Sequence, residues 1–358
     1  MADHSASRPQ WLWDLRSDTA TKPSMAMLQF MMVAKVGDDG LGEDPTVKEL
    51  EARVASLCGK EAALMCASST MSNQVAIRTH LRNPPESVLC HWHSHVFQYE
   101  SGGAAFHSQA MMIPVAPTDS VNLTAQTVEK NLVLDTHLGH KAPTGLIALE
   151  NTLMGAVMPL DDLKDIGELA RKHRIPVHVD GARLWNASVA SGVDLAEYCR
   201  HADSINLCLS KGMGAPVGAL LVGSTEFINK ARHFRKLFGG AWRQAGLLAA
   251  AGLYAIDHIW PTMKDTHALT RRLADGLVDL GFSLVLPVET NMVLVGTHRE
   301  AWANGVHARL VDILEERRVL LGGVYEGCLR IVLHHQISDE CVDIILAAAK
   351  DLLDASKH

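Results

Sequence analysis

The fold is decided by one segment near the middle of the chain, Ser204-Ile-Asn-Leu-Cys-Leu-Ser210-Lys211-Gly212-Met-Gly214-Ala-Pro-Val-Gly218. Its apolar first half predicts a buried strand, and its second half is a glycine-rich turn. Lys211 lies where the strand ends, which is the edge of an open α/β sheet that binds ligands. A desolvated lysine there can lose its proton and act as a nucleophilic amine, although a solvated loop lysine has the same pattern.

A carboxylate ends the preceding apolar run, Ile175-Pro-Val-His-Val-Asp180. We expect Asp180 at the same sheet edge as Lys211. There it can pair with the ring nitrogen of pyridoxal phosphate, which must stay protonated to draw electrons from a substrate α-carbon; alternatively, Asp180 caps the next helix. Arg183, three residues on, can pair with a phosphate or a carboxylate.

A third candidate element is the turn Cys66-Ala-Ser68-Ser69-Thr70, between an expected strand and an expected helix. Free backbone amides at a helix N-terminus, together with three hydroxyl groups, form a phosphate cradle. The same residues would also make an ordinary helix cap.

The rest of the chain predicts an α/β fold with a mainly parallel sheet, because short apolar runs alternate with helical periods from Thr46 to Gly223. We expect a capping box at Thr46 and Glu49. The expected strands are 62–67, 88–90, 111–115, 146–149, 176–179, 205–209 and 217–222, with a helix over 70–80 and an amphipathic helix around Leu163. After Ala249 long helices and isolated strands predict a smaller α+β domain. The predicted division is an N-terminal arm at 1–22, a large domain at 23–255 and a small domain at 256–358.

Composition narrows the class of partner. The chain has 358 residues, 47% hydrophobic, and a net charge of −7 without a basic stripe, which argues against nucleic-acid binding and favours a small molecule. The longest apolar run is too short for a membrane span. The seven cysteines form no C-x-x-C pair, and the N-terminus has no signal-peptide pattern, so we expect a cytoplasmic protein.

Several ordered motifs resemble those of the low-specificity threonine aldolases. They are Asp14-Leu-Arg-Ser17-Asp18-Thr19, Gly42-Glu-Asp-Pro-Thr46, Ser68-Ser-Thr-Met-Ser-Asn73, Tyr99-Glu-Ser-Gly-Gly103, Leu149-Glu-Asn-Thr152, Asp180-Gly-Ala-Arg-Leu184, Leu209-Ser-Lys-Gly212, Gly214-Ala-Pro-Val-Gly218 and Arg243-Gln-Ala-Gly246. The resemblance runs from about Leu15 to Leu346. It implies fold type I of the pyridoxal-phosphate enzymes and cleavage of the Cα–Cβ bond of β-hydroxy-α-amino acids, such as L-threonine, to glycine and an aldehyde.

The resemblance also implies roles for individual residues. Lys211 would hold the cofactor, Asp180 would pair with its ring nitrogen, and His95 would stack on its ring. The phosphate-side positions are Ser69, Thr70 and Ser210; the substrate carboxylate would be held by Ser17, Arg183 and Arg330; and His140 would lie near the substrate hydroxyl. Enzymes of this fold complete each active site with a neighbouring subunit, so a homodimer or homotetramer is implied.

Two other functions stay open at this point. Alanine racemases of fungal peptide biosynthesis resemble the chain too, and Leu41, Ser69, Leu153, Met154 and Trp242 replace residues that are usual in the aldolases. Loss of a polar partner for the hydroxyl would weaken aldol cleavage. A protein that keeps the fold without catalysis, or that binds a metal through His91, His93 and His95 on one strand face, is the second alternative. His95 is better explained as the stacking residue, so we expect no metal.

Overall fold

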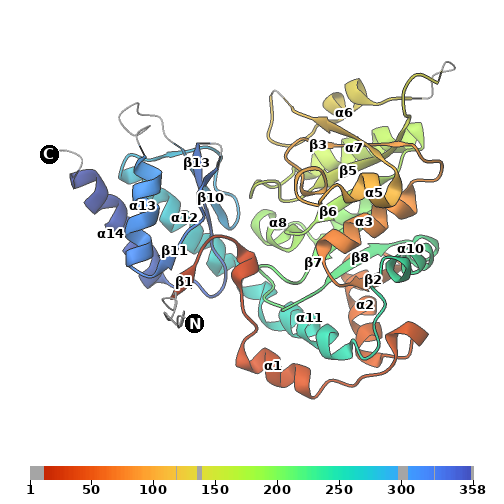
Figure 1. Cartoon of the computed structure of the whole chain (residues 1–358), viewed down its shortest axis with the longest axis horizontal. Helices are drawn as coiled ribbons and strands as arrows, with labels where there is room; N and C mark the ends of the chain where they lie inside the picture. Colours follow the sequence, from red (N-terminus) through yellow and green to blue (C-terminus); the bar gives the residue numbers. More distant parts are fainter. Residues whose placement is uncertain (1–11, 118, 135–138, 297–304, 326, 356–358) are drawn as a thin grey trace, which may run out of the picture. The chain divides into compact units, whose positions relative to one another are not determined.

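The chain divides into two compact units, which we describe separately. The computed structural model describes residues 12–117, 119–134, 139–296, 305–325 and 327–355. The large unit is 22–261, and the small unit joins the N-terminal segment through residue 21 to the chain from 262 onward (Figure 1).

This division differs from the predicted one at two points. Residue 255 lies inside helix α11 (Gly246–His258), and the division falls after that helix ends. The predicted N-terminal arm is also not separate, because β1 (Trp13–Asp14) pairs in parallel with β11 (Val319–Leu320) of the small unit. Residues 1–11 of that arm lie outside the described residues.

The large unit is built on a seven-stranded sheet with the order β2-β8-β7-β6-β5-β3-β4. Strand β8 is antiparallel to both neighbours, and the other neighbouring pairs are parallel. The strands are β2 (Ala62–Cys66), β3 (Ser87–His91), β4 (Met111–Val115), β5 (Thr144–Glu150), β6 (Val177–Gly181), β7 (Ser204–Cys208) and β8 (Ala219–Gly223). The strands expected from the apolar runs lie within two residues of these bounds, because fully buried strands are continuous apolar runs.

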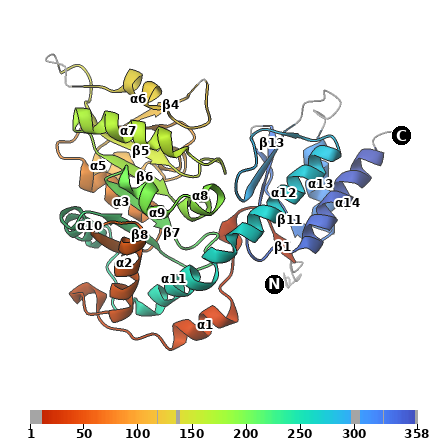
Figure 2. The same ribbon diagram turned by 180° about the vertical axis from the view of Figure 1, so that it is seen from behind.

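Helices lie on both sides of this sheet. Figure 1 shows α3, α5 and α10 over one face, and Figure 2, from behind, shows α7 and α9 over the other. Besides α11, the helices are α1 (Met25–Met32), α2 (Pro45–Leu57), α3 (Ser69–His80), α4 (His95–Gln98), α5 (Gly103–Ser108), α6 (Ala125–Asn131), α7 (Leu160–His173), α8 (Leu184–Ser191), α9 (Leu195–Arg200) and α10 (Thr225–Leu237), with short 3₁₀ helices at η2 (Asp39–Leu41) and η3 (Trp260–Thr262).

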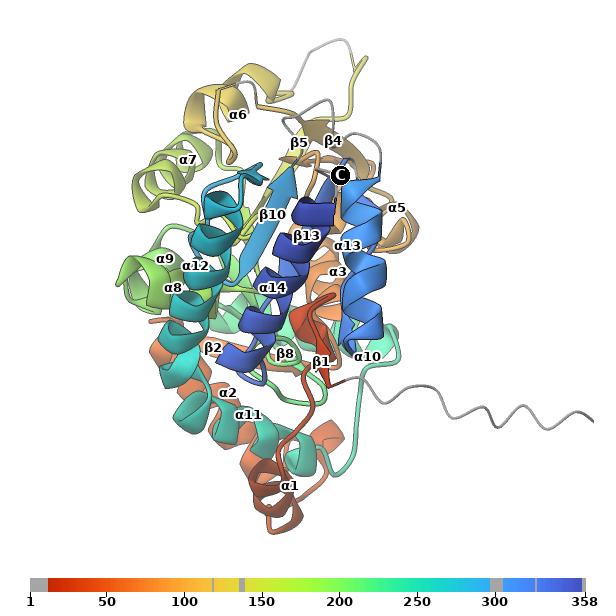
Figure 3. The same cartoon turned by 90° about the vertical axis from the view of Figure 1, so that its left-hand side faces the viewer.

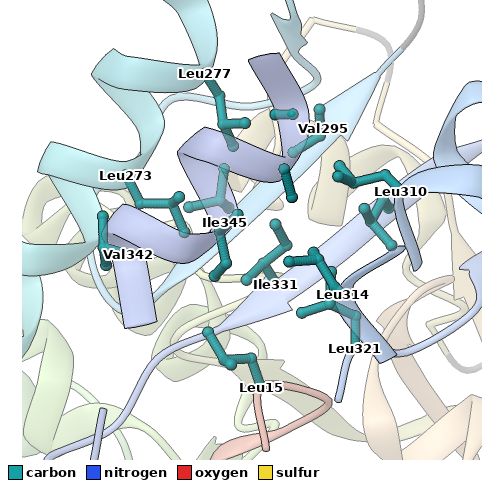
Figure 4. Packing of buried hydrophobic residues seen from close by; sticks show 14 of the residues in the cluster. Leu15, Leu273, Leu277, Val295, Leu310, Leu314, Leu321, Ile331, Val342 and Ile345 are labelled. Atoms are coloured by element: carbon teal, nitrogen blue, oxygen red, sulfur yellow. The ribbon is translucent and has the colours of Figure 1, made fainter. Parts of the chain in front are cut away.

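The small unit packs three helices on one face of a four-stranded antiparallel sheet with the order β12-β13-β10-β9 (Figure 3). Its elements are η1 (Asp18–Ala20), α12 (Met263–Asp279), β9 (Ser283–Leu284), β10 (Met292–Gly296), α13 (Val306–Glu316), β12 (Val324–Tyr325), β13 (Cys328–Val332) and α14 (Asp339–Ala355). Leucine and isoleucine side chains from the helices meet those of β13 in one apolar core, which Leu15 joins (Figure 4). The N-terminal segment is thus part of this core.

Asp44 fixes the entry into α2. Its buried carboxylate accepts hydrogen bonds from the backbone amides of Thr46 (3.1 Å), Val47 (3.0 Å), Gly37 (3.1 Å) and Gly246 (2.7 Å). The predicted capping box at Thr46 and Glu49 is wrong, because Asp44 is the N-cap and Pro45 follows it at the first helical position. One side chain therefore joins α2, the loop before it and the start of α11.

Replacing Asp44 by Ala should lower the free energy of unfolding by about 2–4 kcal/mol, because several buried amides lose their acceptor at once. Asp44→Asn keeps one acceptor oxygen and should fall between Asp44→Ala and the unmutated protein. Thermal melting measures both. Asp161→Ala, which removes an exposed carboxylate from the first turn of α7, is the control; equal melting temperatures for the two alanine variants would contradict this account.

Candidate active site

Three charged side chains meet at the carboxyl edge of the large sheet. Glu150 ends β5, Asp180 lies beside it in β6, and Asn206 of β7 is the register partner of Asp180. Lys211 follows β7 after two further residues, and its positive charge acts on both carboxylates. The parallel register therefore gathers, at one edge, three charged groups that are each 30 or more residues from the next along the chain.

Asp180 is fully buried and is surrounded by donors. Its Oδ1 accepts from Asn206 Nδ2 (2.9 Å) and the amide of Ala182 (3.1 Å), and its Oδ2 accepts from Asn73 Nδ2 (2.8 Å). Burial acts to raise the pKa of Asp180, but Lys211, His95 and the two amide side chains outweigh it and hold the pKa below its ordinary value. The carboxylate is therefore ionised at neutral pH. It does not cap α8, where Arg183 is the N-cap residue.

His95 begins α4 and is held by two carboxylates. Its ring Nδ1 lies 2.9 Å from Glu100 Oε1, and its backbone amide donates to Glu150 Oε2 (2.7 Å). The hydrogen bond to Glu100 raises the pKa of His95 against the opposing effect of burial. Because Nδ1 faces Glu100, the side chain is oriented and its other ring nitrogen is left for a further partner.

Glu150 differs from Asp180 in the direction of its pKa shift. Burial, reinforced by the negative charge of Asp180, raises the pKa of Glu150 to about 7. Two adjacent carboxyl groups thus have pKa values shifted in opposite directions, which is characteristic of functional sites.

The residues expected on the phosphate side lie at the ends of two strands. Ser68 caps α3 and accepts from the amide of Met71, and Ser69 Oγ beside it is buried without a hydrogen-bond partner among the described residues. Thr70 is in the first turn of the same helix, and Ser210 Oγ lies 3.5 Å from Cys208 Sγ. A buried hydroxyl with no partner at a helix N-terminus suits an anionic ligand.

Two of the residues expected at the substrate carboxylate lie together in the small unit. The exposed Arg330 of β13 donates from Nη2 to the carbonyl of Arg16 (3.3 Å), next to Ser17. Ser17 caps η1 by accepting from the amide of Thr19. Arg183 is in the large unit, directly after the Asp180 strand.

The structure does not bring His140 to this cluster within its own unit. His140 is exposed and precedes β5, whose first residue pairs with the start of β3 at the amino edge; nearby, the carbonyls of Ala142 and Pro143 accept from Ser87. Its assignment to the substrate hydroxyl stays a prediction.

The three histidines of the H-x-H-x-H pattern do not share a strand face. Strand β3 ends at His91, and His95 already belongs to α4, because the chain turns between them. Among the described residues, the group whose ligand atoms lie within 4.8 Å of one another is instead His95, Glu100 and Asp180. In this group Glu100 Oε1 and Asp180 Oδ2 accept from Asn73 Nδ2, and His95 Nδ1 lies 2.9 Å from Glu100 Oε1.

Several contributing residues were not assigned a role from sequence. Four residues form hydrogen bonds to Asp180 or to His95: Asn73 and Asn206 donate to Asp180, and Glu100 and Glu150 are bonded to His95. For Asn206 a signal existed, since it is a polar residue inside a strand buried throughout. Asn73 and Glu150 have partners that lie far away in sequence, whereas Glu100 contacts His95, five residues before it, as well as the distant Asn73.

The fold and this edge define a class of protein: an α/β enzyme of fold type I. A threonine aldolase structure from Leishmania major matches with a TM-score of 0.80 at 19% identity, covering 95% of this chain and 99% of that one. A putative L-allo-threonine aldolase from Listeria monocytogenes matches with a TM-score of 0.79 at 20% identity, over 96% and 97% of the two chains.

The chain belongs to the beta-eliminating lyase family, whose model matches residues 14–300. A probable low-specificity L-threonine aldolase of Schizosaccharomyces pombe is 45% identical, over 93% of this chain and 85% of its own length. The low specificity L-threonine aldolase of Saccharomyces cerevisiae is 40% identical (96% and 87%), and that of Escherichia coli O157:H7 is 39% identical (91% and 95%). The family resemblance seen in the motifs is confirmed.

The raised pKa of Glu150 should make stability depend on pH. A carboxyl group whose pKa is about 7 in the folded protein and 4.5 in the unfolded chain loses stability as pH rises between these values. Glu150→Gln removes this loss and keeps an acceptor for the His95 amide. From pH 5 to pH 7.5 the variant should gain about 2 kcal/mol relative to the unmutated apoprotein, or about 4–8 °C in melting temperature. A constant difference across this range would show that Glu150 is not shifted.

Proposed function

We propose that the protein is a pyridoxal-phosphate-dependent lyase that cleaves the Cα–Cβ bond of β-hydroxy-α-amino acids, such as L-threonine or L-allo-threonine, to glycine and an aldehyde. The names of the relatives support this activity over most of the chain. The observation that carries it is the buried Asp180, kept ionised beside Lys211 by two side-chain amides and His95. Burying an anion of this kind costs free energy unless a cationic group pairs with it.

The residues present fit pyridoxal phosphate. Lys211 would hold its aldehyde carbon, Asp180 its protonated ring nitrogen and His95 its ring face, while Ser69, Thr70 and Ser210 would hold its phosphate. The partnerless Ser69 hydroxyl supports the phosphate assignment. The bound cofactor supplies an electron-withdrawing ring that stabilises negative charge at the substrate α-carbon.

The protein side chains set the geometry and the proton positions. Ionised Asp180 would keep the proton on the ring nitrogen of the cofactor, because transfer of that proton to a carboxyl group of lowered pKa is unfavourable. His95 is oriented by Glu100, so its ring cannot rotate freely. Arg183, Arg330 and Ser17 would bind the substrate carboxylate, which selects the α-carbon bond that stands perpendicular to the ring.

Cleavage of the Cα–Cβ bond also needs a base that takes the proton of the β-hydroxyl group. We propose His140, or a water molecule that it orients, for this step. Because His140 is on the amino-edge side of its own unit, a neighbouring subunit is its route to a substrate. The hydroxyl oxygen then becomes the carbonyl oxygen of the aldehyde as the carbon–carbon bond breaks.

Purified protein with added pyridoxal phosphate should release aldehyde from L-threonine, L-allo-threonine and phenylserine. Lys211→Ala should lower kcat/KM by at least about 10³-fold and abolish the visible absorbance of the bound cofactor. Asp180→Asn should lower kcat/KM on the order of 10²-fold, because it removes the charge and little else. Conversion of L-alanine to its D form without aldehyde release would instead identify a racemase.

Two matched substitutions control these variants. Asp203→Asn makes the same chemical change at the amino edge of the sheet, where Asp203 accepts from the amide of Val177. Lys236→Ala removes an exposed lysine from α10. Both should keep the activity of the unmutated protein. A loss in Asp203→Asn as large as that in Asp180→Asn would contradict a special role for Asp180.

We further propose that the chain forms a homodimer or a homotetramer. Helix α1 consists of apolar residues except for Gln29, yet only Met27 and Met31 are buried in it. Met25 (70% exposed), Met32 (79%), Val33 (79%) and Leu41 (73%) extend this apolar surface along the segment before α2. Large apolar side chains exposed in one stretch of the chain favour an interface.

The double variant Met32→Glu, Val33→Glu should therefore shift the protein toward monomer in size-exclusion chromatography with light scattering. Its charges would be buried without partners in the assembled state. Val278→Glu, a charge placed on an exposed position of α12, should leave the mass unchanged. A protein that is monomeric before mutation would refute the assembly.

We also propose a cytoplasmic location and a small amino acid, rather than a nucleic acid or a membrane, as the partner. All seven cysteines are free thiols, six of them buried, which suits a reducing compartment. Among the described residues no helix combines the length and the apolar character that crossing a membrane requires.

A further inference from the structure

A chain of hydrogen-bonded polar side chains crosses the interior of the large unit behind Asp180. His80 Nε2 lies 2.7 Å from Ser204 Oγ, and Ser204 Oγ lies 2.8 Å from His178 Nδ1. His178 Nε2 lies 3.1 Å from Asn73 Oδ1, and Asn73 Nδ2 donates to Asp180. The chain begins at the end of α3 and at the start of β7, on the amino side of the sheet, and ends at its carboxyl edge.

The donor and acceptor of each hydrogen bond in this series of side chains follow from the carboxylate at its end. Asn73 Nδ2 lies 2.8 Å from both Asp180 Oδ2 and Glu100 Oε1, and the ionised carboxylate of Asp180 only accepts hydrogen bonds. The amide nitrogen must therefore face the two carboxylates, and Asn73 Oδ1 must face His178. A flipped amide would bring three oxygens together.

The tautomers of both histidines follow in turn. Asn73 Oδ1 is an acceptor, so His178 Nε2 carries the hydrogen. Burial lowers the pKa of His178 to about 4, so the ring is neutral and its Nδ1 accepts. Ser204 must then donate its single proton to His178 Nδ1, and its oxygen accepts from His80 Nε2. Burial also lowers the pKa of His80 well below its usual value, which leaves this histidine neutral.

We propose that His80, Ser204 and His178 are positioning residues that lock the Asn73 amide with its NH₂ group toward Asp180 and Glu100. Each member acts only through the next, and only Asn73 touches the carboxylates. The role rests on the proposed function of Asp180 as the partner of the cofactor nitrogen. Without these three side chains, the Asn73 amide loses the hydrogen bond that fixes its oxygen, and its donation to Asp180 Oδ2 is weakened.

A core-filling role alone does not account for these residues. His178 and Ser204 are register partners on β6 and β7, and their strand neighbours Val177, Val179 and Ile205 are apolar and buried. Burying polar groups costs free energy unless every donor and acceptor is used. Here four side chains, linked one to the next by hydrogen bonds, have a single set of donor and acceptor assignments, and the last of them donates to a carboxylate.

The first experiment reads the tautomers directly in the apoprotein. Long-range ¹H–¹⁵N NMR spectra of histidine-labelled protein should show His80 and His178 as neutral Nε2–H tautomers between pH 6 and pH 8. His80→Gln and His178→Gln assign the two signals. An Nδ1–H tautomer at His178, or titration of either ring in this range, would overturn the proposal. This test is independent of catalysis, so it stands even if the proposed activity is wrong.

The second experiment tests positioning with a matched pair of serine variants. Ser204→Ala removes the hydroxyl from the chain, and Ser87→Ala removes an equally buried hydroxyl at the start of β3, which donates to the carbonyl of Ala142 instead. Ser204→Ala should mix the tautomers of His178, weaken binding of pyridoxal phosphate to the apoprotein about fivefold and lower kcat by a similar factor. Ser87→Ala should change none of these, although both can lower the melting temperature.

Equal effects of the two serine variants on cofactor affinity and on kcat would show that the hydroxyl of Ser204 is only structural. If the unmutated protein binds the cofactor but cleaves no hydroxyamino acid, the proposed reaction fails, and the affinity comparison still decides the positioning role.

Discussion

The site depends on one buried negative charge. Asp180 is taken out of water at the carboxyl edge of the sheet, and its charge is retained because Lys211, His95 and amide donors from Asn73 and Asn206 offset the cost of burial. The neighbouring Glu150 lacks that set of donors, and its pKa is raised instead of lowered. A difference of a few hydrogen bonds therefore separates an anion that can hold a cationic ring from a carboxyl group that keeps its proton near neutral pH.

Parallel pairing is what makes this environment possible. Strands β5, β6 and β7 are neighbours in register, so residues at their carboxyl ends converge although each belongs to a different β/α unit. Apolar residues in the middle of each strand form the core of the sheet. Polar residues occur at the strand ends or, as with His178 and Asn206, inside a strand where they have a hydrogen-bond partner. The same three strands therefore supply apolar residues to the core and polar residues to the site.

Much of this could be read from the sequence, because its signals are local. Continuous apolar runs placed the strands, and the residues after two of them gave Lys211 and Asp180. The capping-box pattern at Thr46 and Glu49 predicts the wrong cap, because the Asp44-Pro45 pair, itself a helix-start pattern, begins α2. The histidine pattern failed because the strand ends at His91, one residue into it. Asn73 and Glu150 could not be assigned, since their partners lie 27 to 107 residues away in sequence and depend on the order of strands and helices. Glu100 lies five residues from His95 but 27 residues from Asn73.

The pairing of β1 with β11 has a consequence for how the protein is made. Leu15 belongs to the core of the small unit, whose other members lie beyond residue 262 (Figure 4). During synthesis residues 22–261 emerge and can complete their sheet before Val319 and Leu320, the strand partners of Trp13 and Asp14, have been made. Residues 13–15 therefore reach their place in the small unit only after the ribosome has translated the chain past residue 320.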